Sequence, residues 1–119
     1  MSEPREIGER AFEFAVRVVK LCRAIDGGDN ASRVLSRQLI RSGTSIGANI
    51  EEGKGSQSRA DFRAKYSIAL KEARETHYWL RLLRGTGCPG HPELEALIRE
   101  SDELIRILTS IIKKLKANP

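Results

Sequence analysis

Arginines recur at helical spacing in two places in the sequence. Arg33, Arg37 and Arg41 are four residues apart. Arg59 and Arg63 repeat that spacing further along the chain. Residues four apart lie on one face of a helix, so each set predicts a basic ridge. Such a ridge could follow the phosphates of a nucleic acid, or it could pair with carboxylates of neighbouring helices, and the sequence leaves both interpretations open.

The side chains that catalysis or metal binding would need are few. His91 lies near Cys88 in a Gly- and Pro-rich stretch, but a thiolate and an imidazole supply only half of a four-ligand zinc site. Glu72, Glu75 and His77 are close in sequence without forming the Glu-x-x-His spacing of di-metal helical bundles. We therefore predict no enzyme activity, no metal site and no cofactor.

The composition favours a helical domain with anionic partners. The 119 residues suffice for one domain with a modest core, and aromatic residues, at 5%, are too few for a typical sheet. Lys and Arg outnumber Asp and Glu by 21 to 16, which favours nucleic acid as a partner, although solvated basic faces would give the same balance. Cys22 and Cys88 are expected to be free thiols. Without a signal peptide or membrane span, we expect a soluble cytoplasmic protein.

Apolar residues at alternating spacings of three and four predict helices over most of the chain. The expected helices are at about 4–26, 31–53, 58–84 and 92–117. Asn30 or Ser32 is the expected N-cap of the second helix, and Ser58 of the third. Because short connections make neighbouring helices antiparallel, we predict one all-α domain, an antiparallel up-down-up-down four-helix bundle.

A patch of small residues surrounds Gly43 and Gly47 in the second helix. Each glycine destabilises a helix by up to ~1 kcal/mol relative to alanine. This segment is therefore either two helices or one continuous helix with a thin face, meaning a face without bulky side chains. We favour one helix, because glycines four apart share a face that another backbone can approach closely. With Ile46 and Ile50, they are candidates for helix packing or for an oligomer contact.

Apolar residues beyond those of a single stripe predict an oligomer. The first helix adds Phe12, Val16 and Val19 to its core stripe, and the last helix has adjacent apolar pairs. A lone bundle needs about one stripe per helix, so the surplus indicates a partner surface.

Two segments resemble a known family. Residues 38–53, QLIRSGTSIGANIEEG, resemble the LxRSxxSIxxNIxEG signature of the S23 or 23S rRNA intervening-sequence proteins. Residues 66–83, YSIALKEARETHYWLRLL, are similar to that family's IALKEAxETxYWLxLL block. Many members have proline where this chain has Gly47.

The resemblance implies a four-helix bundle that assembles as a ring-like homopentamer. The family includes accessory proteins of diversity-generating retroelements, which bind the element's reverse transcriptase and nucleic acid through a basic surface. Other members are encoded within insertions of large-subunit ribosomal RNA genes. We therefore expect an oligomeric adaptor that binds RNA or DNA and a reverse transcriptase and does not bind membranes. The alternative is an oligomeric protein-interaction scaffold without direct nucleic-acid contact.

Four polar residues of these blocks are expected to project into the bundle. They are Asn49 and Glu52 in the second helix and Glu72 and Glu75 in the third. Each pair is spaced by three residues and so shares one helical face. They either fix the register of the helices, which we favour, or bind a ligand.

Overall fold

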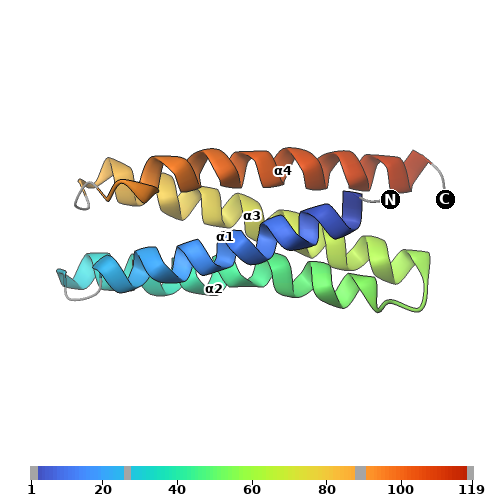
Figure 1. The fold of residues 1–119 in the computed structure, drawn as a ribbon, viewed down its shortest axis with the longest axis horizontal. Coiled ribbons are helices and arrows are strands. Elements are labelled where there is room, and N and C mark those ends of the chain that lie inside the picture. The colour runs from blue at the N-terminus through green and yellow to red at the C-terminus, as the bar shows by residue number, and fades with distance from the viewer. Residues whose placement is uncertain (1–2, 26–27, 88–90, 118–119) are drawn as a thin grey trace.

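Four long helices make up the computed structural model of the protein, which describes residues 3–25, 28–87 and 91–117 (Figure 1). The helices are α1 (Glu3–Ile25), α2 (Asn30–Lys54), α3 (Arg59–Gly85) and α4 (Glu93–Ala117). No strand occurs in the described ranges. The first and last residue of each helix differ from the expected ones by at most one position. The predicted all-α fold is confirmed.

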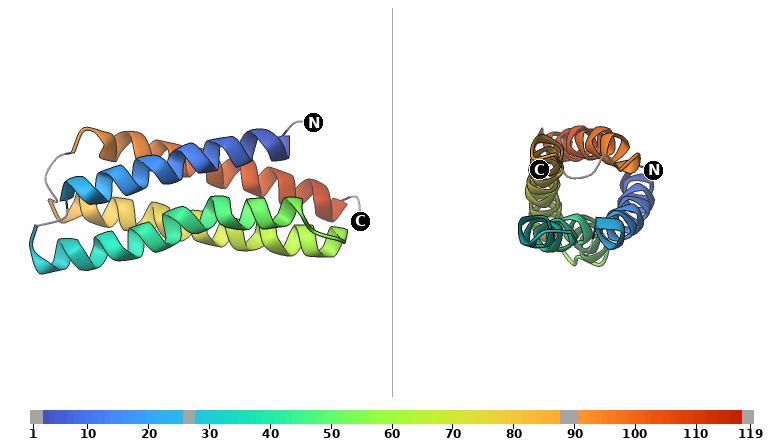
Figure 2. Two further views of the ribbon diagram at one scale, coloured as in Figure 1. Left: turned by 60° about the horizontal axis from the view of Figure 1, so that its bottom comes forward. Right: turned by 90° about the vertical axis from the view of Figure 1, so that its left-hand side faces the viewer.

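The helices stand at the corners of a square when the bundle is viewed end-on (Figure 2). The bundle measures 47 × 20 × 19 Å. Each helix packs on its two neighbours in the order α1, α2, α3, α4, and α1 closes the ring against α4. The chain reverses direction at every connection, as Figure 1 shows, which agrees with the predicted up-down-up-down arrangement.

The core consists of the stripes that the apolar spacing predicts. On α1, the buried residues are Ile7, Ala11, Phe14, Val18, Leu21 and Ile25. On α4, Leu97, Leu104 and Leu108 are fully buried. Burying a large apolar side chain contributes about 1.5–3 kcal/mol, so these stripes hold the helices together.

The helix caps differ in part from those expected. Asp29 caps α2, because its Oδ1 accepts a hydrogen bond of 2.7 Å from the Ser32 backbone N–H. The prediction of Asn30 or Ser32 is therefore wrong: Asn30 is the first helical residue, and Ser32 is the donor. Ser58 caps α3 as predicted, by accepting from the Asp61 N–H at 3.0 Å.

Helix α2 continues unbroken through Gly43 and Gly47, so the prediction of a single helix is confirmed. A Cβ added to Gly43 would lie 3.0 Å from Val18 Cγ1, and one added to Gly47 would lie 3.5 Å from Ala11 Cβ. The thin face thus packs on α1 of the same chain. Ile46 and Ile50 are fully buried in the core, so all four residues pack helices within the subunit.

Candidate nucleic-acid interface

Two of the predicted arginines line a shallow hollow between α1 and α2. Arg33 and Arg37 reach it from α2, and Arg23 reaches it from α1. Arg33 donates through Nη1 to the Gly28 carbonyl oxygen. No described carboxylate oxygen lies within 4.0 Å of these three guanidinium groups. Sequence reasoning missed Arg23, because only the packing of α1 on α2 brings it to the other two.

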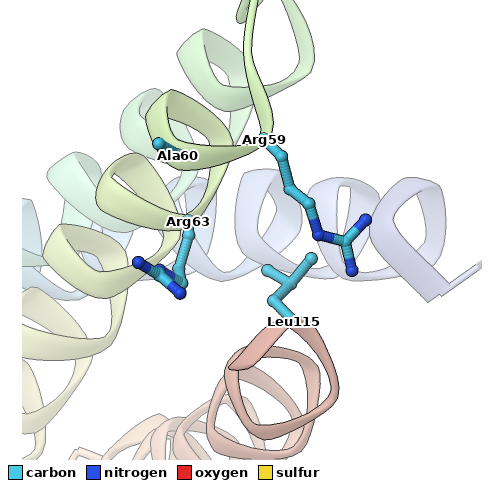
Figure 3. A pocket seen from close by; sticks show the side chains of 4 residues that line it. All are labelled: Arg59, Ala60, Arg63 and Leu115. Carbon is cyan, nitrogen blue, oxygen red and sulfur yellow. The ribbon is translucent and has the colours of Figure 1, made fainter. Parts of the chain in front are cut away.

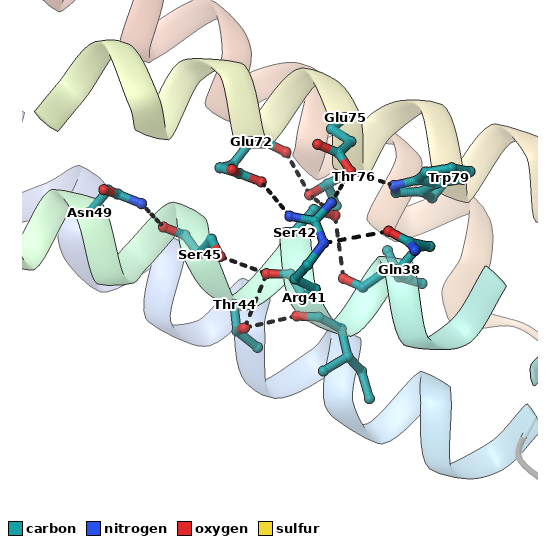
Figure 4. A network of polar contacts seen from close by, with 12 residues as sticks. Gln38, Arg41, Ser42, Thr44, Ser45, Asn49, Glu72, Glu75, Thr76 and Trp79 are labelled. Atoms are coloured by element: carbon teal, nitrogen blue, oxygen red, sulfur yellow. Dashed lines mark hydrogen bonds and ion pairs between the residues drawn. The ribbon is translucent and has the colours of Figure 1, made fainter. Parts of the chain in front are cut away.

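Arg41, the third arginine of the predicted ridge, is bound within the protein instead. Its Nη1 lies 3.5 Å from Glu72 Oε1, and its Nη2 forms an ion pair with Glu75 of the same helix α3. Gln38 accepts from Arg41 Nε at 3.4 Å, and Trp79 donates to Glu75 at 3.1 Å, as Figure 4 shows. The charge of Arg41 is thus balanced by two carboxylates, and less of it is available to a phosphate.

Arg59 and Arg63 extend from the first two turns of α3 on either side of Leu115 of α4 (Figure 3). Arg59 is exposed, and Arg63 is half-buried. Neither guanidinium group has a salt-bridge partner among the described residues. Both cations are therefore accessible to an external anion.

The five predicted arginines do not form one surface. Arg33 and Arg37 lie near the start of α2, and Arg59 and Arg63 lie near the start of α3. Because α2 and α3 are antiparallel, the two groups are near opposite ends of a bundle 47 Å long. A ligand that contacts both groups has to span much of the bundle.

The four polar residues expected inside the bundle have different surroundings. Glu72 is buried, with 8% of its surface exposed, and Glu75 is half-buried. Asn49 donates to the Ser45 carbonyl of its own helix at 2.8 Å. The prediction is wrong for Glu52, which is exposed and pairs with Lys65 at 2.8 Å.

Two polar contacts inside the bundle were not predicted from the sequence. The Thr76 hydroxyl lies 2.9 Å from the Ser42 hydroxyl, between α3 and α2. His77 Nδ1 lies 2.9 Å from Ser101 Oγ, between α3 and α4. Because the Ser101 hydroxyl donates to the Ile98 carbonyl at 2.8 Å, we infer that the His77 nitrogen is the donor to Ser101. Small hydroxyl residues at core positions of the helical pattern are the signal that could have identified these contacts.

Comparisons with known proteins agree with this architecture. The family model described as 23S rRNA-intervening sequence protein matches residues 3–110. The chain belongs to this family. The chain is similar to the crystal structure of a protein of unknown function from the S23 ribosomal protein family of Bacteroides thetaiotaomicron. The two sequences are 45% identical, the match covers 93% of this chain and 98% of the other, and the TM-score is 0.83. A comparison with curated proteins finds no significant match.

The described part of this 23S rRNA-intervening sequence protein contains no group of three His, Cys, Asp or Glu residues that could hold a metal ion. His91 accepts from the Glu93 N–H through Nδ1 at 3.1 Å, so its ring caps the start of α4. Cys88 lies outside the described residues. The Cys22 thiol is buried beside the Ser36 carbonyl, and burial raises its pKa. Within the described ranges, no helix has the length and apolar character needed to span a bilayer.

Proposed function

We propose that this 23S rRNA-intervening sequence protein is a homopentameric adaptor that binds RNA or DNA through its exposed cations. The observation that carries the proposal is the set of arginines without a carboxylate partner among the described residues, including Arg37 and Arg59. Both are exposed. Guanidinium groups that are not already neutralised can replace the counterions of a nucleic-acid backbone.

An apolar surface on α1 supports the oligomeric part of the proposal. Phe12 is 68% exposed and Val16 is 37% exposed on this helix. Both line one hollow on α1, together with Val19. An exposed apolar surface indicates a protein partner, and we assign a second copy of this chain to it.

Light scattering and a nucleic-acid titration test the two parts separately. A mass near five times the 13.3 kDa of the monomer supports the pentamer, and a monomer mass at micromolar concentration contradicts it. Phosphate contacts weaken steeply with salt, so binding should be measured at about 50 mM salt. Absence of binding to both RNA and DNA under that condition contradicts the nucleic-acid part.

A reverse transcriptase of a diversity-generating retroelement is the protein partner in this proposal. The support is the resemblance of residues 38–53 and 66–83 to the family blocks. A reverse transcriptase gene and a variable-repeat target gene beside this gene would support the assignment. A location within an rRNA operon would contradict it.

The second candidate function is an oligomeric scaffold without nucleic-acid contact, and the observation that favours it is the position of Arg41. Because Glu72 and Glu75 hold its guanidinium group, the predicted ridge offers fewer cations to phosphate. A pentamer that binds no nucleic acid at low salt is the outcome that this alternative requires.

A further inference from the structure

The outward face of α1 combines acidic and apolar side chains. Glu9 and Glu13 are exposed and lie four residues apart. Phe12 and Val16 follow them at a spacing of three, so all four residues share one side of the helix. Neither carboxylate has a salt-bridge partner among the described residues. Like charges four residues apart repel each other, so a basic surface that covers this acidic α1 face stabilises it.

The outward face of α3 has the opposite charge. Lys71, Arg74 and Tyr78 follow one another at spacings of three and four residues, and all three are exposed. The two cations have no salt-bridge partner in the part of the chain that the structure describes. Tyr78 is 54% exposed, and its ring packs edge-on against Trp79 with centroids 5.4 Å apart. This basic α3 face thus presents an oriented aromatic ring beside an arginine, and both residue types are enriched in protein interfaces.

The two faces belong to opposite corners of the bundle. Helix α1 packs on α2 and α4, and α3 occupies the corner diagonally across (Figure 2). Outward faces at opposite corners point in opposite directions, so one subunit cannot cover its own acidic α1 face with its basic α3 face. A second copy can do so, and its own α1 face then remains free for a third copy. Such a contact is heterologous, because it joins two different surfaces.

Contacts through α2 show which residues of α1 and α3 lie at the same height along the bundle. Gly43 of α2 packs against Val18 of α1. The preceding residue, Ser42, contacts Thr76 of α3 with 2.9 Å between the two hydroxyl oxygens. Val18 and Thr76 therefore mark one level of the bundle. Because α1 and α3 are both antiparallel to α2, they run in the same direction from that level.

Counting from this level places the acidic and basic residues at equal heights. Glu13 precedes Val18 by five residues, and Lys71 precedes Thr76 by five residues. At 1.5 Å per residue, both lie about 7.5 Å from the level, towards the same end. Copies that stand side by side in the same direction therefore bring the two faces together without sliding along the bundle. A heterologous contact without such a shift can close into a ring, whereas a shift would produce a filament.

The residues beyond this level define where the contact ends. Lys20 follows Val18 by two residues, and Tyr78 follows Thr76 by two, so an ammonium group on α1 comes opposite an exposed aromatic ring. Three residues further along each helix, Arg23 and Arg81 come opposite each other. Two arginines repel, so the contact extends from Glu9 to Lys20 on α1 and does not include Arg23.

We propose that the acidic α1 face of one copy packs on the basic α3 face of the next, so that the copies assemble head to tail. This inference rests on the oligomer of the proposed function and names the surface that covers Phe12 and Val16. In a ring built this way, every subunit uses both faces. Reversal of the charge of either face should therefore weaken every contact between copies.

The test reverses the charge of each face separately and then of both together. E9K/E13K makes the α1 face basic, and K71E/R74E makes the α3 face acidic. Each double variant places like charges opposite each other in the proposed contact. The quadruple variant E9K/E13K/K71E/R74E exchanges the two charges and makes the faces complementary again. It also contains every substitution of the double variants, so its assembly would show that none of them prevents folding.

The matched control for K71E/R74E is R99E/K113E, which reverses two exposed cations of α4. Helix α4 lies outside the proposed contact. Masses are measured by light scattering at micromolar concentration in about 150 mM salt. The protein is first treated with nuclease and purified, so that nucleic acid cannot hold copies together. Circular dichroism checks that each variant is helical.

We expect both double variants to shift from the wild-type mass towards the 13.3 kDa of the monomer. Half-maximal assembly should need a protein concentration about tenfold higher or more, because opposed like charges oppose association. The quadruple variant should regain the wild-type mass, and R99E/K113E should keep it. An unchanged mass for K71E/R74E would overturn the inference, as would a quadruple variant that is as dissociated as the double variants. A monomeric wild-type protein would instead overturn the oligomeric part of the proposed function itself.

Discussion

The ring of Tyr66 on α3 packs directly on the backbone of Gly53 on α2. A Cβ added to Gly53 would lie 2.9 Å from Tyr66 Cε1, closer than side-chain atoms normally approach. Tyr66 is fully buried, and its ring stacks on Phe62 with centroids 4.3 Å apart. The ring therefore has little room to move, and only glycine fits opposite it.

Gly53→Ala should destabilise the bundle in spite of alanine's higher helix propensity. Overpacking costs about 1–3 kcal/mol, and the propensity gain offsets up to about 1 kcal/mol of this. Gly85→Ala on α3 is the matched control, because nothing lies within 4 Å of its added Cβ. Urea unfolding should rank Gly53→Ala below wild type and Gly85→Ala at or above it. Equal stability of the two variants would show that the Tyr66 ring can move aside.

Tyr66 should also make stability depend on pH in the alkaline range. Burial, and to a lesser extent the charge of Glu51, raises the pKa of Tyr66 from 10.0 to about 12. The folded state therefore holds the phenolic proton more tightly than the unfolded state. Its contribution to stability is complete below pH 10 and is lost as the pH rises towards 12. The loss of unfolding free energy between these values should be smaller in Tyr66→Phe, and identical pH profiles would contradict the assignment.

Arg41 and Arg37 should differ in their effect on stability, although they are neighbours on one predicted ridge. Arg41→Ala removes the cation beside Glu72, which is buried, and should cost about 1 kcal/mol because the pair is partly solvated. Arg37→Ala should stay within about 0.5 kcal/mol of wild type. A double-mutant cycle between Arg41→Ala and Glu75→Ala measures the coupling by urea unfolding. Coupling indistinguishable from zero would mean that Arg41 is not held by α3.

Phe12→Ser with Val16→Ser should lower the oligomer mass without loss of helical content. Both side chains are exposed on α1, so the variant removes apolar surface outside the core. Val34→Ser on α2 also replaces an exposed valine, 41% exposed, with serine, so it serves as the control for making the surface more polar away from α1. Light scattering should give a smaller mass for the α1 variant and the wild-type mass for the control. An unchanged mass for the α1 variant would place the contact between copies elsewhere.

The helices and the core could be predicted from the sequence because both follow from the spacing of apolar residues. Leu97, Leu104 and Leu108 are buried where a stripe at that spacing must be. The caps were harder to predict, since Asp29, Asn30 and Ser32 are all residue types that cap helices. Which of them is the N-cap depends on where the helix begins. Asp29 is the residue with an extended backbone just before the first turn of α2.

The candidate site was predictable only as far as single helices. The pairing of Arg41 with Glu75 joins positions 34 apart, and it depends on how α2 and α3 are rotated against each other. Glu52 and Glu72 illustrate the same limit, because similar local patterns place one on the surface and the other inside.

The seam between α1 and α4 has a consequence for the order of folding events. Arg10 and Glu100, 2.7 Å apart across that seam, are separated by 90 positions. The other three helix contacts join helices that are consecutive in the chain, so each can form as a local hairpin. Closing the ring requires the longest loop and so has the largest entropic cost. The hairpins are therefore expected to form first, on the microsecond-to-millisecond scale of helical bundles, with the docking of α1 on α4 as the last step.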